Sequence, residues 1–217
     1  MSAARRSRAP YTRQDFINCP YDDEYRPLLK AIVFAVHACE FTARLALEEP
    51  GSERLRLERL VSLIGECRLG IHDLSRVRSS DQDALPRFNM PFECGVFYGA
   101  LQFGATRQAQ KRFLLLDSVP YRPQRTMSDA AGLDPRTHHD NPAVAVACVR
   151  DFLAVDRNPR PMGATKINAL YEEFQADLPQ LAREADLEAT ELEPLTAFND
   201  WHFFAGQWLS ERARQAR

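Results

Sequence analysis

The chain has 217 residues, which suits one domain of moderate size with an extension, or two small domains. Hydrophobic residues make up 45% of it and charged residues 27%, so a core can form without disulfides or structural metals. The formal net charge of −2 excludes a general electrostatic attraction to nucleic acid or anionic membranes, and no apolar run reaches the roughly 18 residues of a membrane span. We therefore expect neither nucleic acid nor a membrane as a partner.

Cysteine usage and the first residues of the chain bear on its location. The five cysteines are scattered without a CxxC pair, and the basic segment at residues 1–13 is not followed by an apolar one. This pattern favours reduced thiols and a cytoplasmic protein over a secreted one. Residues 1–13 are expected to form a disordered basic arm.

Residues 14–157 alternate between short apolar runs and segments with helical spacing of apolar residues. Strands are predicted at residues 15–19, 41–47, 67–74 and 112–116. Helices are predicted at residues 21–39, 57–64, 91–103 and 142–153. Either Asp22 or Asp23 is a candidate cap for the first of these helices.

The alternation predicts an α/β fold, namely a flavodoxin-like (Rossmann-like), doubly wound parallel sheet of about five strands with helices on both faces. Ligands of such sheets bind beyond the carboxyl ends of the strands. In this chain that edge includes residues 18–20, residues 73–75 and the loop before Glu93, where polar groups stand next to apolar runs.

Residues 158–217 are predicted to form a helical C-terminal extension after a linker-like stretch, NPRPMG. Apolar residues recur at helical spacing from residue 167 to residue 174, and Pro179 is expected to break that helix. In the last segment Asp200 is a candidate N-cap, and four apolar side chains share one helix face: Trp201, Phe204, Trp208 and Leu209. This face either packs on the sheet domain or forms an assembly surface.

Glu93 is the single carboxylate of an otherwise apolar helix expected to begin at Pro91. Gly95 and Gly99 leave this helix a smooth face, which another backbone or a flat ligand can approach closely. An ionised carboxylate in an apolar crevice can attack the anomeric carbon of a sugar or stabilise it when it becomes positively charged. The alternative is an ordinary acid in the first turn, which complements the helix dipole.

The other polar candidates each have two interpretations. Asp73 ends a strand and either orients a ribose hydroxyl or braces the following turn. His72 points to the opposite face of the same strand and is interpreted as a packed histidine, while Asn89 either caps the helix or binds a ligand. Residues 138–140, His-His-Asp, are interpreted as a loop, and no metal site is expected because no further ligands stand at a suitable spacing.

Three segments, FINCPYDDEYRPLLKAI, CRLGIHDLS and NMPFECGVFYGA, resemble the sequence blocks of a Rossmann-like superfamily. It contains the nucleoside 2-deoxyribosyltransferases and the Toll/interleukin-receptor (TIR) and TIR-like domains. Its bacterial nucleotide-binding members show a strand ending in F-I-x-x-P-F-D, a strand ending in D-L-S/T, and F-E-x-G-x-x-x-G at the start of a helix. The similarity covers roughly residues 14–155.

The resemblance implies that Glu93 is the catalytic carboxylate, which attacks C1′ of a nucleoside in the transferases and cleaves the nicotinamide–ribose bond of NAD in enzymatic TIR domains. It also implies that Asp73 positions the sugar. Further residues expected around the substrate are Asn18, Cys19, Pro20, Asp22, Ser75, Asn89 and Phe92. The turn before Glu93, Asn-Met-Pro-Phe, matches the usual signature of neither group, so the substrate stays open.

The leading hypothesis is an enzyme that cleaves or transfers the N-glycosidic bond of NAD or of a nucleoside or nucleotide, without a metal or bound cofactor. The resemblance to TIR-like branches implies a bacterial anti-phage defence effector. The alternative is a non-catalytic nucleotide-binding sensor or assembly module of a defence system. Expected partners are a nucleotide-type small molecule and either a second copy of the chain, as a homo-oligomer, or another defence protein.

Overall fold

The computed structural model describes residues 9–48, 55–76, 87–127 and 132–215. Its five strands form one sheet in the order β2-β1-β3-β4-β5, and all neighbouring strands are parallel. The strands are β1 (Gln14–Asn18), β2 (Thr42–Arg44), β3 (Leu69–Asp73), β4 (Arg112–Asp117) and β5 (Arg136–Thr137). This is the flavodoxin-like strand order, so the predicted doubly wound sheet is confirmed.

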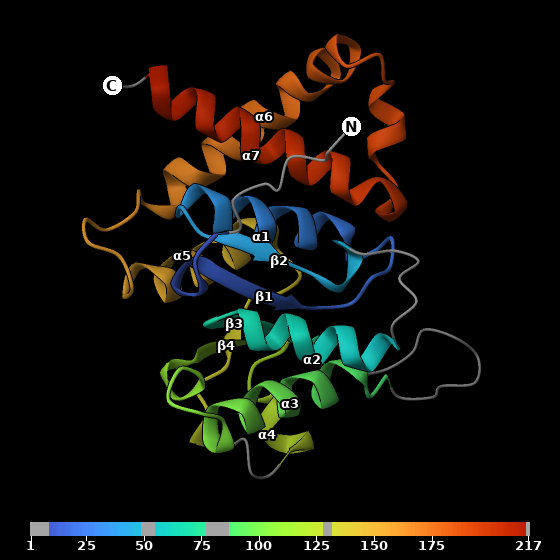
Figure 1. The fold of residues 1–217 in the computed structure, drawn as a ribbon. Helices are drawn as coiled ribbons and strands as arrows, with labels where there is room; N and C mark the ends of the chain where they lie inside the picture. Colours follow the sequence, from blue (N-terminus) through green and yellow to red (C-terminus); the bar gives the residue numbers. More distant parts are fainter. Residues whose placement is uncertain (1–8, 49–54, 77–86, 128–131, 216–217) are drawn as a thin grey trace, which may run out of the picture.

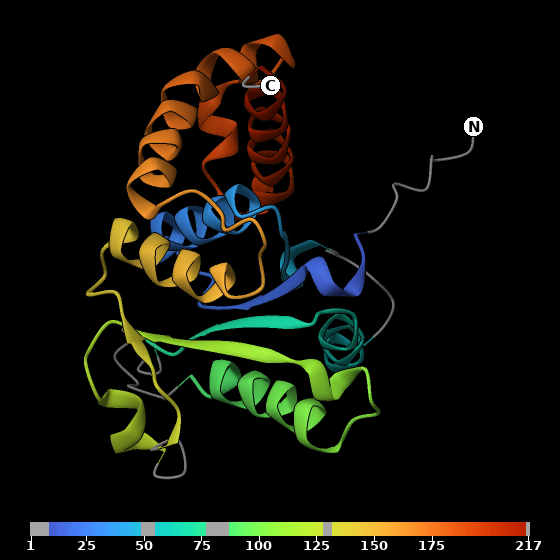
Figure 2. The ribbon, with the colours of Figure 1, turned by 90° about the vertical axis from the view of Figure 1, so that its left-hand side faces the viewer.

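Helices cover both faces of the sheet (Figures 1 and 2). On one face lie α1 (Arg26–Ala38) and α5 (Pro142–Ala154), and on the other lie α2 (Arg56–Glu66) and α3 (Asn89–Phe103). The C-terminal helices, α6 (Ala164–Glu184) and α7 (Phe198–Gln215), form an outer layer over α1 and α5. Shorter elements among the described residues include α4 (Arg122–Thr126) and the 3-10 helices η1 (Tyr11–Arg13), η2 (Ala46–Glu48), η3 (Gln108–Gln110), η5 (Ala189–Leu192) and η6 (Leu195–Ala197).

The alternation of side chains along each strand divides the core between the two faces. On β1, Ile17 belongs to the large cluster under α1 and α5, whereas Phe16 belongs to the smaller cluster under α2 and α3. On β3, His72 packs against Phe16 and Phe97, whereas Asp73 contacts Tyr25 on the other side. The prediction that His72 and Asp73 face opposite ways is confirmed.

The aromatic residues of the C-terminal helices belong to the core. Phe34 of α1 packs against Phe174 of α6 and against Trp208 of α7, with ring centroids 5.5 and 6.2 Å apart. Trp201 and Trp208 are both buried, and Phe204 packs against the same cluster. Of the two interpretations of this face, packing on the sheet domain is therefore the one that the structure shows.

Several predicted boundaries were wrong. Pro179 does not end its helix, because α6 continues to Glu184 and buried side chains on both sides of the proline, Phe174 and Ala182, hold it on the core. This packing outweighs the backbone hydrogen bond that a proline removes. Asp200 is not an N-cap, since α7 already begins at Phe198 and Asp200 lies in its first turn.

The N-terminal arm is more ordered than predicted over the part that the structure describes. Residues 11–13 form η1, and the Tyr11 hydroxyl donates a hydrogen bond to the Arg107 carbonyl at 2.8 Å. Residues 1–8 lie outside the described residues. Within the described parts of the chain, no helix is both long and apolar enough to cross a membrane.

Candidate functional site

A cavity of about 390 Å³ lies at the carboxyl edge of the sheet, beside β1 and β2. Its wall is built from the loop after β1, the end of β2 and the segment after it, one side of α2 along its whole length, and Glu93 of α3. The lining residues are Tyr21, Arg44, Leu45, Ala46, Leu47, Glu48, Arg56, Arg59, Leu60, Ser62, Leu63, Glu66 and Glu93. Its volume lies within the range of small-molecule sites, roughly 300–1,000 Å³.

Glu93 is the fifth residue of its helix, because α3 begins at Asn89, two residues earlier than predicted. It therefore lies beyond the first turn, and the interpretation as an ordinary first-turn acid was wrong. Burial raises the pKa of the Glu93 carboxyl above its ordinary value, and the positive charge of Arg56 only partly opposes this shift. A half-buried carboxylate with a raised pKa is a stronger base and nucleophile than one in water.

The cavity wall carries charges of both signs. Arg44 is buried and held by acids of the same wall, since its guanidinium donates to Glu48 at 2.8 Å and to Glu66 at 3.2 Å. Arg56, the first residue of α2, is exposed. Its positive charge partly opposes the burial that raises the pKa of the neighbouring Tyr21 phenol. Arg44 therefore belongs to an internal ion-pair network, whereas Arg56 is accessible to a ligand.

Tyr21 contributes an aromatic ring to this wall. Burial raises the pKa of its phenol, and the neighbouring Cys19 and Glu93 raise it further, so the hydroxyl is neutral at physiological pH. With the leucines of the wall it offers an apolar surface to a flat ligand, and its hydroxyl supplies a donor. Tyr21 was not predicted, although it stands between Pro20 and Asp22, which were both expected around the substrate.

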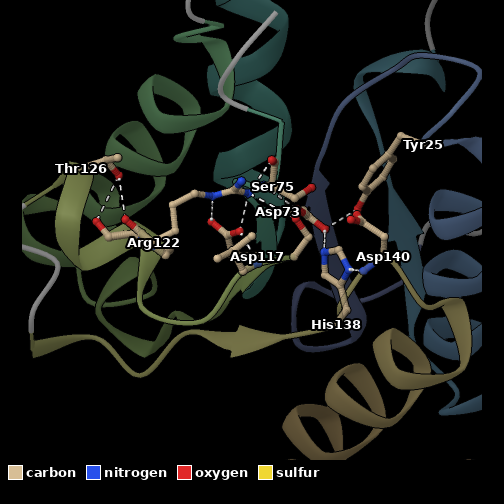
Figure 3. Close-up of polar contacts among 11 residues, drawn as sticks. Tyr25, Asp73, Ser75, Asp117, Arg122, Thr126, His138 and Asp140 are labelled. Atoms are coloured by element: carbon tan, nitrogen blue, oxygen red, sulfur yellow. Dashed lines mark hydrogen bonds and ion pairs between the residues drawn. The ribbon is translucent and has the colours of Figure 1, made fainter. Parts of the chain in front are cut away.

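A second polar cluster lies at the carboxyl ends of β3, β4 and β5 (Figure 3), and its members Asp73, Asp117 and His138 are buried. Asp73 is fully buried and accepts hydrogen bonds from the Tyr25 hydroxyl at 2.6 Å and from the Ser75 amide at 2.8 Å. The Nε2 of His138 lies 3.0 Å from the same carboxylate. Burial raises the pKa of Asp73, but the hydrogen bonds from His138, Ser75 and Tyr25 outweigh it and hold the pKa below its ordinary value.

His138 is oriented by its own neighbour, because its Nδ1 accepts a hydrogen bond from the Asp140 amide at 3.0 Å. This leaves Nε2, which lies 3.0 Å from the Asp73 carboxylate, as the ring nitrogen that carries the proton. The interpretation of residues 138–140 as a loop was right, and among the described residues no group of three potential ligands could hold a metal. The role of His138 was missed because its partner lies 65 positions away in the sequence.

The cluster continues to β4 and α4. Arg122 of α4 forms an ion pair with Asp117 at the end of β4, and the same guanidinium donates to the Ser75 carbonyl (Figure 3). The Asp117 carboxylate also accepts from the Val119 amide at 2.9 Å. Arg122 thus ties the end of β4 to the segment after β3, and His138, just after β5, lies against Asp73 at the end of β3.

The remaining residues predicted from the first strand do not line the cavity. The Asn18 amide donates to the Met90 carbonyl at 2.8 Å and lies 3.0 Å from Nδ1 of His72, so it fastens the start of α3 to the sheet. Cys19 and Pro20 are buried, and burial raises the pKa of the Cys19 thiol. The Asp22 carboxylate accepts from the Tyr25 amide and pairs with Arg87 at 2.8 Å.

The candidates near α3 lie apart from the cavity as well. Ser75 is buried in the second polar cluster, whereas Asn89 and Phe92 face solvent, and the N-cap of α3 is Phe88 rather than Asn89. The structure therefore brings Glu93 together with residues of α2 and of the segment after β2, and Asp73 is not part of that wall, although both acids lie close enough to Cys19 to raise its pKa.

Fold and site together define an α/β protein with a doubly wound sheet and a cavity at its carboxyl edge. The cavity wall includes Glu93, a half-buried acid with a raised pKa. Comparisons of the chain with protein-family models, with curated proteins and with solved structures found no match. An assignment of function therefore depends on the chemistry of the cavity.

Proposed function

We propose that this protein cleaves or transfers the N-glycosidic bond of NAD or of a nucleoside or nucleotide, with Glu93 as the carboxylate that meets the anomeric carbon. One observation carries the proposal. Glu93 lies on the wall of a cavity at the carboxyl edge of a doubly wound sheet, where burial raises its pKa. Such an edge is the ordinary ligand site of this fold class.

The chemistry follows from the charge of the transition state. As the bond between the anomeric carbon and the base nitrogen breaks, its electron pair leaves with the base and positive charge develops on the sugar. The Glu93 carboxylate is poorly solvated in its crevice, so its attraction to that charge is stronger than it would be in water. The carboxylate then either forms an ester with the sugar or stabilises it until water or a second base attacks.

Other residues of the wall have supporting roles in this proposal. Tyr21 and the leucines of α2 hold the base, and Arg56 faces the negatively charged part of a nucleotide. Asp73 has both carboxylate oxygens engaged within the protein. We therefore assign Asp73 a positioning role, in which it holds the strand end, rather than a contact with ribose.

The setting of the activity is proposed on the resemblance alone. The three sequence blocks that resemble TIR-like and deoxyribosyltransferase-like proteins include Glu93, and this support is independent of the cavity. A bacterial anti-phage effector that consumes a nucleotide is the setting that the resemblance favours.

Mass spectrometry of a substrate mixture tests the activity. The protein, at high concentration, is incubated with NAD, NADP, nucleosides and deoxynucleotides, beside Glu93→Gln. We expect one component to disappear with release of its free base, and Glu93→Gln to reduce that rate by at least about 10³-fold, as expected when a reacting group is removed. A wild-type rate in Glu93→Gln would refute the assignment.

The alternative function is a nucleotide sensor without turnover. It is favoured by the separation of Asp73 from the cavity, which leaves Glu93 without the partner acid that the resemblance implies. Binding of one component with a thermal shift, but without loss of any component, would select the sensor over the enzyme.

A further inference from the structure

Helix α3 lacks the polar face that a helix on the outside of a sheet ordinarily carries. Among its 15 residues, Asn89–Phe103, Glu93 is the single charged one. The side facing the sheet buries Met90, Cys94 and Phe97. The opposite side therefore has no charges to keep it in water.

Three large aromatic side chains stand on that outer side. Phe88, just before the helix, is 66% exposed, Phe92 is 54% exposed and Phe103 is 91% exposed. Their spacing of four and eleven residues places them on one stripe, opposite the buried side. In Figures 1 and 2, α3 lies in an outer layer of the described structure, on the side of the sheet opposite the C-terminal helices.

Two glycines separate Phe92 from Phe103 on the same stripe. At Gly95 and at Gly99 an added Cβ would meet no atom of the protein within 4 Å. The fold itself therefore does not need these positions to be small, although glycine weakens a helix relative to alanine. A shallow hollow with an aromatic side chain at each end is left on the surface.

We propose that this stripe is where a second copy of the chain docks, with α3 packed antiparallel on α3 about a two-fold axis. An axis that passes between Gly95 and Gly99 places Gly95 opposite Gly99 of the second copy, so the two backbones approach closely. The same register brings Phe92 to within one residue of the position opposite Phe103 of the second copy, on both sides of the crossing. The stripe is thus complementary to itself.

The three exposed aromatic side chains supply about half of the area that a stable dimer contact takes from each partner. At about 150–250 Å² for each aromatic side chain, the exposed parts of Phe88, Phe92 and Phe103 amount to roughly 300–500 Å². A stable interface takes about 800 Å² from each partner. On the neighbouring helix of the same layer, Leu57 and Val61 are 49% and 51% exposed and enlarge the apolar surface. A second copy supplies the same uncharged surface, whereas a charged partner would find no counter-charge on the stripe.

Sedimentation velocity of the full chain at increasing concentration tests this inference. We expect the wild-type mass to rise to twice the 24.7 kDa of one chain. Gly95→Leu fills the hollow and is expected to weaken the dimer at least tenfold, while its melting temperature stays at or above the wild-type value. The matched control is Gly206→Leu on α7, where the position is also open but lies on the opposite layer, and it is expected to keep the dimer.

Two results would overturn the dimer. One is a wild-type chain that stays at 24.7 kDa throughout the concentration series, and the other is a Gly95→Leu chain that dimerises with wild-type affinity. If Gly95→Leu fails to fold, Phe103→Ser decides, because that side chain is 91% exposed and the monomer does not depend on it. The inference does not rest on the function proposed for the cavity, since neither variant replaces a residue of its wall.

Discussion

Two acids at the same edge of the sheet, Asp73 and Glu93, have opposite environments. Asp73 is fully buried, accepts hydrogen bonds from Tyr25 and Ser75, lies 3.0 Å from His138, and has a lowered pKa. Glu93 stands half-buried on a cavity wall and has a raised pKa, with only Arg56 opposing the shift. The carboxylate of Asp73 has its hydrogen-bonding positions filled by the protein, so it stabilises the structure. The carboxylate of Glu93 is poorly solvated and faces a cavity, so it is available to react with a ligand.

The two environments come from the two faces of the sheet. Asp73 lies on the face under α1 and α5, where Tyr25 and His138 cover it, and the C-terminal helices form a further layer over this face. The face under α2 and α3 has a single helical layer, and it is here that the cavity opens. The face covered by two helical layers thus holds the buried acid Asp73, and the face covered by one layer holds the acid Glu93 in a cavity that a ligand can enter.

The largest effect is expected from Asp73→Ala. It leaves the Tyr25 hydroxyl and the His138 ring buried without their acceptor, and we expect it to lower the free energy of unfolding by about 3–5 kcal/mol. Urea denaturation measures this. Asp23→Ala, which breaks an exposed ion pair with Arg26, is the control and should cost less than about 1 kcal/mol. Equal losses in the two variants would contradict the bracing role of Asp73.

A smaller effect of opposite sign is expected from Glu93→Gln. Because the folded state raises the pKa of Glu93, it penalises the ionised form, and the neutral amide should stabilise the fold at pH 7. Water screens a half-buried group, so the gain should stay below about 1 kcal/mol. It should vanish as the pH falls towards 4.5, the ordinary Glu value, where the wild-type carboxyl becomes protonated.

Urea denaturation across this pH range measures the difference between Glu93→Gln and the wild-type chain. Glu172→Gln, at an exposed position of α6, is the matched control and should leave the free energy of unfolding within about 0.5 kcal/mol of the wild-type value. A loss of stability in Glu93→Gln at pH 7 would show that the Glu93 carboxylate is a structural acid like Asp73.

The smallest effect is expected from Arg56→Ala. The positive charge of Arg56 lowers the pKa of Glu93, so its removal should raise that pKa. If the ionised carboxylate is the active form, the acid limb of the pH–rate profile then moves to higher pH, by less than about one unit. Arg56→Lys keeps the charge and should leave the limb in place. A limb that does not move in Arg56→Ala would exclude Glu93 as the group that titrates.

Much of the fold could be predicted because apolar spacing is a local signal. The long helices and the four longer strands were predicted from that spacing, and the parallel sheet followed from their alternation. Residues 122–126 and 136–137 were missed because a short helix and a two-residue strand carry too few apolar positions for a period to show. The prediction that the helix ends at Pro179 was wrong because the lost backbone hydrogen bond of a proline is visible in the local sequence. The packing that offsets this loss comes from segments far away in the sequence.

The site was harder to predict than the fold. Glu93 was identified because a single acid in an apolar helix is visible in the sequence. Its neighbours Arg56 and Tyr21 were missed, since only the fold brings α2 and the loop after β1 to the same wall. The partnership of Asp73 with His138 joins residues 65 positions apart, and the available signal was only a histidine next to turn residues.

The division of roles between Glu93 and Asp73 is tested most directly by measuring turnover per folded molecule in Glu93→Gln and Asp73→Asn side by side. The substrate is the component that the wild-type chain consumes, and the folded fraction is taken from circular dichroism in the same buffer. We predict that Glu93→Gln is fully folded and loses turnover by at least about 10³-fold, whereas folded Asp73→Asn keeps most of it. Wild-type turnover in Glu93→Gln, or a fully folded but inactive Asp73→Asn, would contradict the account.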